Sequence, residues 1–208
     1  MIDVKKAVRV SVAQLVELLA DTAFVAKVAK CHIDAETVNL PTAKELVSLD
    51  PYLAVGVVLE TVDGELFTVG YQKTSPVEAD AWVKENVLPP IRQYELLSAD
   101  EFKQVTALLV GGKFPLWAHC GYIVEGGLIS ATLDGDNNRF GRPYYLHDVA
   151  TVLAIAGEAT PESDEAYIKK YGLSNLMPVG VAHDPVYDSL VSAVVLSHAL
   201  DRILVVVS

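Results

Sequence analysis

Two pairs of adjacent histidine and cysteine residues are the first candidates for chemistry in this sequence. The pairs are Cys31-His32 and His119-Cys120, and together they offer the nitrogen and sulfur ligands of a tetrahedral zinc site. Neighbouring side chains on a strand or a helix rarely converge on one ion, and zinc motifs usually space their ligands by two or more residues. The pattern therefore favours packed cysteines and ordinary histidines, and His119 is kept as a weak metal candidate.

Two His-Asp dipeptides, His147-Asp148 and His183-Asp184, are the next candidates. Such a dipeptide can mark a metal-dependent phosphohydrolase, in which further ligands on helices complete the metal centre. His183-Asp184 precedes a proline, so it is typical of a turn, where aspartate commonly forms local hydrogen bonds. We therefore keep His147 and Asp148, together with Glu125, as the site residues of an alternative, catalytic interpretation.

Residues 134–138, with the sequence Asp-Gly-Asp-Asn-Asn, resemble the start of a calcium-binding loop. The glycine expected at the sixth position of such a loop is Arg139, and the glutamate expected at the twelfth is Tyr145. A polar hairpin turn explains the same residues through turn chemistry alone. Asp134 and Asp136 are therefore weak metal candidates, and the sequence predicts no resident metal ion and no other cofactor.

Motifs of the familiar nucleotide-binding enzymes are absent from the sequence. It contains no G-x-S-x-G nucleophile elbow, no phosphate-binding loop ending in G-K-[ST] and no G-x-G-x-x-G fingerprint after a strand. The net charge is −11, from 16 basic and 27 acidic residues. Because nucleic acids and anionic membranes attract basic surfaces, we expect neither of them as a partner.

The composition is apolar for a chain of this size. Of its 208 residues, 51% are hydrophobic and 21% are charged. A large core with many buried strands explains these values; the sharper alternative is an apolar surface covered by a partner or by further copies of the chain. Two cysteines are too few for a disulfide scaffold and the N-terminus does not read as a signal peptide. Cys31 and Cys120 are thus expected to be free thiols in the cytoplasm, or in a virus particle assembled there.

Local signals predict both helices and strands. A capping box at Ser11 and Gln14 starts a helix that runs to about Lys30. Asp63-Gly64 is the predicted turn of a β-hairpin over residues 52–71, because a tight turn needs a positive φ there. Further helices are expected over 98–110, 147–156 and 160–170, and further strands over 114–124, 128–133, 190–196 and 203–207.

These elements indicate an α+β protein with a mixed or antiparallel sheet flanked by helices. No low-complexity linker or long charge run divides the chain. We therefore expect a single α+β domain over residues 1–208, with residues 1–50 forming a helical N-terminal extension packed on it.

The order of four segments resembles a Nudix fold, including its variant phage and bacterial members. Residues 52–71 are similar to the opening hairpin of that fold, and residues 117–127 to the strand that leads into its site. Residues 147–157 occupy the place of the Nudix-box helix, and residues 172–196 that of a later loop and strand. The resemblance implies a Nudix-like fold.

The chemistry of the Nudix box does not carry over to this chain. The box ends in R-E-U-x-E-E-x-G, whose glutamates hold magnesium. Alignment on Gly157 puts Ala150, Thr151, Ala154 and Ile155 at the arginine and glutamate positions. None of these side chains is a magnesium ligand, so the pyrophosphatase site is expected to be inactive.

The leading functional interpretation is a non-catalytic binding or assembly protein, such as a phage structural or accessory component. It would bind a protein partner or copies of itself, with no nucleic acid and no membrane. The alternative is a Nudix-type or metal-dependent phosphoesterase with a variant site, in which Glu125, Asp134, Asp136, His147 and Asp148 are the residues to test.

Overall fold

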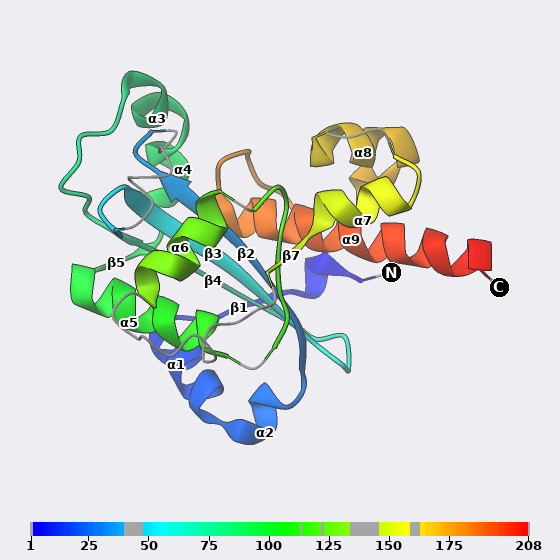
Figure 1. Ribbon diagram of the computed structural model, residues 1–208, viewed down its shortest axis with the longest axis horizontal. Helices are drawn as coiled ribbons and strands as arrows, with labels where there is room; N and C mark the ends of the chain where they lie inside the picture. The colour runs from blue at the N-terminus through cyan, green and yellow to red at the C-terminus, as the bar shows by residue number, and fades with distance from the viewer. Residues whose placement is uncertain are drawn as a thin grey trace.

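The computed structural model describes residues 2–39, 48–112, 114–121, 123–133, 146–158 and 163–207. Within these ranges a seven-stranded mixed sheet is flanked by helices (Figure 1). The strands are β1 (Val8–Arg9), β2 (Val28–Thr37), β3 (Tyr52–Thr61), β4 (Leu66–Lys73), β5 (Glu95–Leu97), β6 (Leu116–Ala118) and β7 (Leu146–Asp148). The α-helices are α1 (Val12–Ala20), α2 (Thr22–Val25), α3 (Ala81–Asn86), α4 (Leu88–Ile91), α5 (Ala99–Val110), α6 (Val124–Thr132), α7 (Val149–Ile155), α8 (Asp164–Tyr171) and α9 (Pro185–Val207).

The strand order is β1-β4-β3-β2-β6-β7, with β5 paired to β4. Strands β2, β3 and β4 are antiparallel, whereas β6 runs parallel to β2 and β7 runs parallel to β6. The expectation of a mixed sheet flanked by helices is confirmed, but the class is α/β and not the expected α+β. The hairpin over 52–71 is confirmed as well, since β3 and β4 pair around a turn in which Gly64 has φ +81°.

Two apolar layers cover the two faces of the sheet. On one face α1, α5 and α6 pack against β2 residues such as Cys31 and Ile33. On the other face α9 packs on β2 and β3, and α7 and α8 lie beside α9 (Figure 1). A smaller apolar cluster joins α3 and α4 to the sheet through Val83, Val87 and Tyr94. Successive side chains of β2 therefore point to opposite faces of the sheet, and only one of these faces is covered by α9.

The start of α9 sits directly on the sheet because Gly56 has no side chain. A Cβ atom added at Gly56 would lie 2.1 Å from the carbonyl carbon of Pro185. In addition, the Ser189 hydroxyl donates a hydrogen bond to the Gly56 carbonyl oxygen at 3.2 Å. Gly56 is paired with Asp34 of β2, so this contact places the first turn of α9 next to that carboxylate.

The expected helical character of residues 1–50 is wrong. The predicted capping box at Ser11 is present, but α1 ends at Ala20 and Val28–Thr37 forms a central strand. The strand is stabilised by pairing with β3 on one side and β6 on the other, which are contacts that local propensity does not report. That residues 1–208 form one domain remains a prediction.

In two regions where a pair of strands was predicted, the structure contains a helix. Of the strands expected over 114–124 and 128–133, the described residues form a strand only at Leu116–Ala118, and residues 128–132 belong to α6. The strands expected over 190–196 and 203–207 belong to the 23-residue helix α9. A helix buried on several sides loses its polar stripe, and a continuous apolar run does not distinguish it from a buried strand. The helices predicted over 98–110 and 147–156 are confirmed as α5 and α7.

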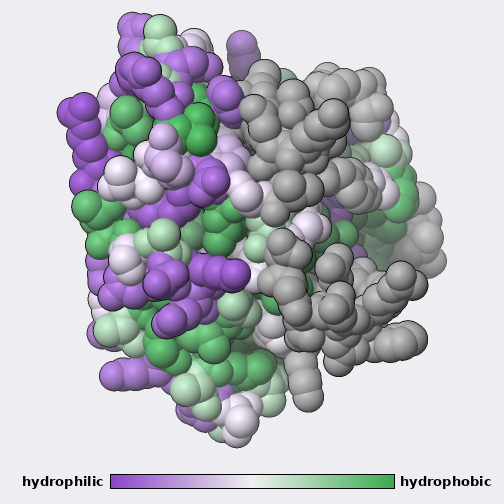
Figure 2. Space-filling view, turned by 60° about the vertical axis from the view of Figure 1, so that its left-hand side comes forward, coloured by the Kyte–Doolittle hydropathy of each residue, from purple (hydrophilic) through white to green (hydrophobic). Residues whose placement is uncertain are grey.

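The buried sheet accounts for much of the apolar composition. All ten residues of β3 are buried, and three apolar clusters enclose the sheet and its helices. On the coloured part of the surface in Figure 2, hydrophobic and hydrophilic residues are interleaved. No helix in the described ranges is long and apolar enough to cross a membrane.

We expect Gly56→Ala to destabilise the protein by about 1–3 kcal/mol, because the added methyl group forces α9 away from β3. Gly126→Ala is the matched control, since the nearest atom to a Cβ there is at 3.6 Å and the residue lies within α6. Thermal or urea unfolding of the two variants measures the difference. Equal stability of both variants would contradict the proposed seating of α9.

Candidate active site

Strand β2 carries two carboxylates toward α9. Asp34 and Glu36 are two residues apart, so their side chains lie on the same face of the strand. Asp34 pairs with Gly56 and Glu36 with Ala54, and opposite residues of an antiparallel pair share a face. Since Gly56 contacts Pro185, that face is the one that α9 covers. Both carboxylates lie near the carboxyl end of β2, where ligand sites of α/β sheets commonly form.

A third carboxylate fills the gap where β6 separates from β2. The two strands pair only at Cys31 with Leu116 and at His32 with Trp117. Further along β2, the Ala35 amide therefore has no strand partner, and it donates instead to Glu125 Oε1 at 3.1 Å. Glu125 belongs to the first turn of α6 and is buried. This hydrogen bond ties one carboxylate oxygen to the strand that carries Asp34 and Glu36.

The start of α9 supplies a fourth carboxylate, Asp188, and the turn before it supplies the imidazole of His183. Asp184 precedes the helix and accepts hydrogen bonds from the Val186 and Tyr187 amides at 3.1 and 3.2 Å. His183 has φ +63°, and its amide donates to Asp188 Oδ2 at 2.9 Å. The Asp184 carboxylate also accepts from the Tyr94 hydroxyl, which anchors the turn to α3 and α4 through their shared apolar cluster.

The side chains of Glu36, His183 and Asp188 line one cleft of about 430 Å³. Ligand atoms of Glu36, His183 and Asp188 all lie within 4.8 Å of one another, and His183 Nδ1 is 3.8 Å from Glu36 Oε1. Asp34 and Glu125 line the same cleft. We use the name carboxylate cluster for Asp34, Glu36, Glu125 and Asp188.

Burial raises the pKa of every member of the carboxylate cluster, and repulsion within the cluster adds to the shift at Asp34 and Glu36. Burial raises the pKa of Glu36 to about 8, with Asp188 and Glu125 adding to the shift. It raises the pKa of Glu125 and of Asp188 to about 7, although backbone hydrogen bonds oppose the shift at both. The pKa of Asp34 is raised well above its usual range by burial and by the charges of Glu125 and Glu36. A cation in the cleft would relieve this repulsion.

The donor set fits a hard divalent cation. The cluster offers carboxylate oxygens, with one imidazole nitrogen at its edge. Oxygen ligands of this kind suit Mg²⁺ and Mn²⁺, and the absence of thiolates from the cluster argues against a zinc site of the cysteine type. Cys31 points into the opposite apolar layer, and burial raises the pKa of its thiol. Cys31 and Cys120 are both free, as expected.

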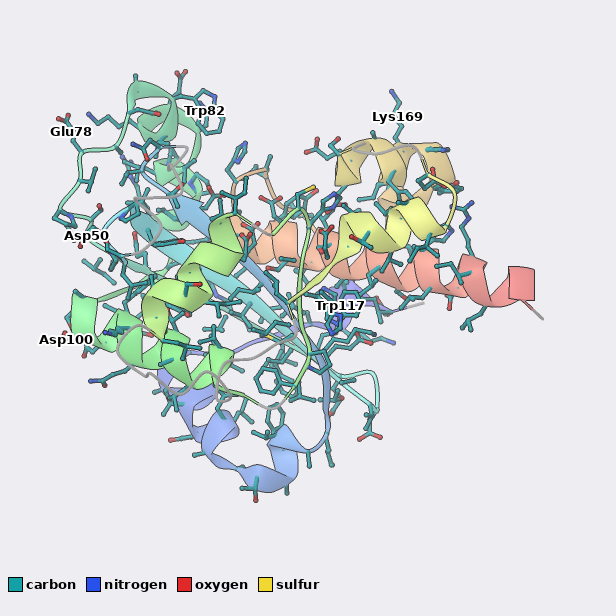
Figure 3. All side chains as sticks on the ribbon, viewed as in Figure 1. Asp50, Glu78, Trp82, Asp100, Trp117 and Lys169 are labelled. Carbon is teal, nitrogen blue, oxygen red and sulfur yellow. The ribbon has the colours of Figure 1, made fainter. Side chains whose placement is uncertain are left out.

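An apolar hollow opens beside the cleft, and we name it the side chamber. It measures about 450 Å³ and shares Glu36 and His183 with the cleft. Trp82 of α3 forms one wall and is 53% exposed, and its ring centroid lies 4.9 Å from that of His183. Figure 3 shows Trp82 on α3, well separated from Trp117. The remaining lining residues are Ala35, Thr37, Asn39, Asp80, Val83, Val87 and Val124.

The residues of the alternative catalytic interpretation do not all meet. Glu125 lines the cleft, but the His147 ring stacks on Trp117 with centroids 4.6 Å apart. Asp148 starts α7, and its carboxylate accepts from the Cys120 amide at 2.8 Å and from the Thr151 amide at 3.1 Å. Roles for His147 and Asp148 therefore stay predictions without support from this arrangement.

Of the three weak metal candidates from the sequence, the structure describes His119 only. His119 lines the cleft, where it contacts Asp164. Asp134 and Asp136 lie outside the described residues. Their proposed part in metal binding stays a prediction.

Sequence reasoning missed Asp34, Glu36 and Asp188. The first two lie within residues 1–50, which were expected to form a helical extension, yet polar residues alternate with apolar ones from His32 to Glu36, which is a strand signal. For Asp188 the signal was Asp184-Pro185, an N-cap followed by a first-turn proline. Read as a helix start, that dipeptide places Asp188 within one turn of His183.

Comparison with known proteins gives a fold but no family. No protein-family model and no curated protein matches the sequence. The structure of Exonuclease X in complex with 5′ overhanging duplex DNA is similar, with a TM-score of 0.54 and 13% identity over 83% of this chain and 91% of that one. An exonuclease I structure has a TM-score of 0.56 and 13% identity over 85% of this chain and 43% of that one. The structure of cell-death related nuclease 4 has a TM-score of 0.51 and 11% identity over 83% of this chain and 64% of that one. This chain therefore spans less than half of that exonuclease I chain. At these identities the likeness establishes the fold alone, and this chain shares that fold with the three nuclease structures.

Three expectations from the sequence are corrected by these comparisons. The Nudix resemblance is wrong, because the sheet topology matches the exonucleases. The interpretation as a non-catalytic assembly protein or phage component is overturned, since the structures that share the fold are nucleases. The exclusion of nucleic acid is overturned by the DNA in the Exonuclease X structure. Net charge sums the whole surface, so it does not report the local charge of any one site.

The raised pKa values predict that the metal-free protein becomes less stable as the pH rises. Unfolded carboxyls titrate near pH 4, whereas Glu36, Glu125 and Asp188 titrate at about 7 to 8 in the fold. Between these values the folded state binds more protons, so the free energy of unfolding falls with increasing pH. In metal-free buffer we expect Glu36→Gln to stabilise the protein by roughly 1–3 kcal/mol at pH 8 and by much less at pH 5.

Thermal unfolding with a chelator at both pH values measures this effect. Mg²⁺ or Mn²⁺ at about 100 times its Kd should stabilise the wild type by about 2.7 kcal/mol at pH 8, and Glu36→Gln should lose most of this gain. Glu78→Gln is the control, because Glu78 is exposed, pairs with Lys84 and does not line the cleft. A wild-type protein that is equally stable at pH 5 and 8, and indifferent to both cations, would rule out the cluster as a cation site.

Proposed function

We propose that this protein is a metal-dependent phosphodiesterase that hydrolyses nucleic acid, in the manner of an exonuclease. The carrying observation is the carboxylate cluster, which brings four acidic side chains from β2, α6 and α9 into one cleft. Such a cluster costs stability without a cation, so a fold that retains it has a use for the cation. The exonucleases that share the fold support nucleic acid as the substrate class. The proposal develops the earlier alternative of a metal-dependent phosphoesterase with a variant site.

Asp34, Glu36, Glu125 and Asp188 are the residues that would hold divalent cations. When bound there, such cations polarise a phosphodiester, lower the pKa of water and stabilise the leaving oxygen. The protein's own contribution is to fix the ligands. Glu125 is held by the Ala35 amide, and Asp188 by the His183 amide. These hydrogen bonds keep two carboxylates in place before any substrate arrives, which reduces the reorganisation needed during reaction.

His183 is placed to accept the proton of the attacking water. Its side chain is 42% exposed at the edge of the cleft, so substrate and solvent both reach it. Its backbone is fixed in the left-handed region next to the capped start of α9. The ring is packed edge-on against Trp82 and lies near Glu36. A base must lie within reach of the proton it removes, and this position beside the carboxylate cluster meets that condition.

The side chamber suits a nucleobase of the substrate. It has an exposed tryptophan on one wall and Val83 and Val87 on its apolar lining. Aromatic side chains stack on any base, so such a wall gives affinity with little sequence preference. Because the chamber shares Glu36 and His183 with the cleft, a base held there leaves the adjacent phosphodiester at the carboxylate cluster.

We expect Mg²⁺- or Mn²⁺-dependent release of nucleotides from labelled DNA or RNA. Asp34→Asn, Glu36→Gln, Glu125→Gln and Asp188→Asn should each lower kcat/KM roughly 100-fold or more, since each weakens cation binding that contributes several kcal/mol to the transition state. Glu78→Gln should retain wild-type activity. Single- and double-stranded substrates labelled at the 5′ or 3′ end distinguish exonuclease from endonuclease products. Failure to cleave any of these substrates with either cation would refute the proposed function.

Trp82→Ala should raise KM for an oligonucleotide about 5- to 100-fold, because base stacking contributes about 1–3 kcal/mol. Trp82→Phe should lose much less, since it keeps an aromatic face. Steady-state kinetics on one substrate at fixed cation concentration separates KM from kcat. If Trp82→Ala had the same KM as the wild type, the base would have to lie elsewhere.

A further inference from the structure

A second histidine lies in the cleft and takes no part in the mechanism described above. His119 follows the last residue of β6, and its Nδ1 atom contacts Oδ1 of Asp164, the first residue of α8. The side chains are 17% and 15% exposed, and both line the cleft. Residues from two separate elements are thus paired at the wall of the carboxylate cluster.

The pairing fixes which edge of the imidazole is available. With Nδ1 directed to Asp164, the Nε2 atom lies on the other side of the ring. Among the described residues, no hydrogen bond to His119 Nε2 is formed. A carboxylate on one imidazole nitrogen orients the ring and favours the tautomer that carries the proton on that nitrogen, and it stabilises the imidazolium, in which both nitrogens carry protons.

The two histidines of the cleft have different surroundings. His183 borders both the cleft and the side chamber, beside Glu36 and Trp82. His119 borders the cleft but not the side chamber. The His119–Asp164 pair lines the same cleft as the carboxylate cluster, and the charge of Asp164 helps to raise the pKa of Asp34 and of Asp188. In-line displacement needs proton transfer at two places, the attacking water and the leaving oxygen.

We propose that His119, oriented by Asp164, is the proton donor to the leaving oxygen of the phosphodiester. The assignment rests on the proposed phosphodiesterase function. Water oxygen bonds to phosphorus and gives one proton to His183, while the phosphorus–oxygen ester bond breaks and its electron pair stays on the leaving oxygen. The Nε2 proton of His119 then moves to that oxygen and produces an alcohol. One proton enters and one leaves the protein, and exchange with solvent restores both imidazoles.

The electrostatic surroundings of His119 favour its protonated form. Burial lowers the pKa of His119, but the hydrogen bond and charge of Asp164, together with the charge of Asp148, outweigh burial and raise it. These groups come from α8 and from the start of α7. Glu125 of α6 and Asp34 of β2 line the same cleft and are also acidic. A proton donor is therefore maintained toward neutral pH, where it is useful for acid catalysis.

The test compares two substrates that differ in their need for a proton. An oligodeoxynucleotide loses a sugar alkoxide, which must be protonated, whereas the p-nitrophenyl ester of thymidine 5′-monophosphate loses a stable phenolate. We expect His119→Gln to lower kcat on the oligonucleotide about 100- to 10,000-fold and to lower it less than about threefold on the ester. Asp164→Asn should show the same selectivity with a smaller loss. His183→Gln should be impaired on both substrates, because both need an activated water.

Two further measurements keep the assignment separate from folding and cation binding. Histidine NMR titration of the metal-free protein should show the midpoint of His119 above that of an ordinary histidine and lowered by Asp164→Asn. Thermal unfolding should give His119→Gln the wild-type stabilisation by Mn²⁺. Loss of that stabilisation would identify His119 as a cation ligand and overturn the proposal.

The kinetic outcomes are equally decisive. Equal losses on oligonucleotide and ester would overturn the role of His119 as a leaving-group acid while leaving the phosphodiesterase function intact. Inactivity of the wild-type protein on both substrates would refute that function and this assignment together, and the NMR midpoint would then report only on the His119–Asp164 pair. An oligonucleotide-selective loss, with normal cation stabilisation, supports the proposal.

Discussion

The contact between Gly56 and Pro185 is the constraint on which the cleft depends. A side chain of any other residue at Gly56 would overlap the backbone at the start of α9. Because Gly56 pairs with Asp34, the first turn of α9 must lie over the strand that carries that carboxylate. Asp188, in the first turn of α9, and His183, in the turn before it, then lie beside Glu36 of β2. The cap formed by Asp184 with the Val186 amide fixes the direction in which the helix leaves the sheet.

The same packing creates an electrostatic conflict that the fold does not resolve by itself. Four carboxylates are held in a partly buried cleft, and burial raises the pKa of each. Elsewhere the chain neutralises its buried acids: Glu60 pairs with Lys30 at 2.7 Å, and Glu158 pairs with Lys170 and Arg202. Among the described residues, the carboxylate cluster has no lysine or arginine partner, and the basic side chain beside it is His183. Stability is commonly sacrificed at functional sites, and this contrast within one molecule is the physical argument for a cation.

Local chemistry in the sequence predicted the local elements. The capping box at Ser98, the hairpin turn at Asp63-Gly64 and the glycine that ends α8 at Gly172 all lie where their residue types indicate. Strand β2 could not be found in this way, because its stability comes from pairing with β3 and β6 across the chain. With β2 unrecognised, Asp34 and Glu36 had no common face on which to meet. Of the candidate site, Glu125 and His119 were kept as candidates from the sequence alone, whereas His183 was assigned to a turn because α9 was hidden by its own apolarity.

The acidic character of the protein takes on a different meaning once the cleft is known. A net charge of −11 repels a polyanion, so the protein is not expected to hold nucleic acid through counterion release along a basic surface. In the proposed function, affinity comes instead from short-range contacts: cations at the carboxylate cluster and stacking on Trp82. Both act on one phosphodiester and its neighbouring base, and neither extends along the strand. An interaction confined to so few nucleotides is better suited to the end of a chain, where one base is free to leave its stack, than to the interior of a duplex, where unstacking costs a few kcal/mol.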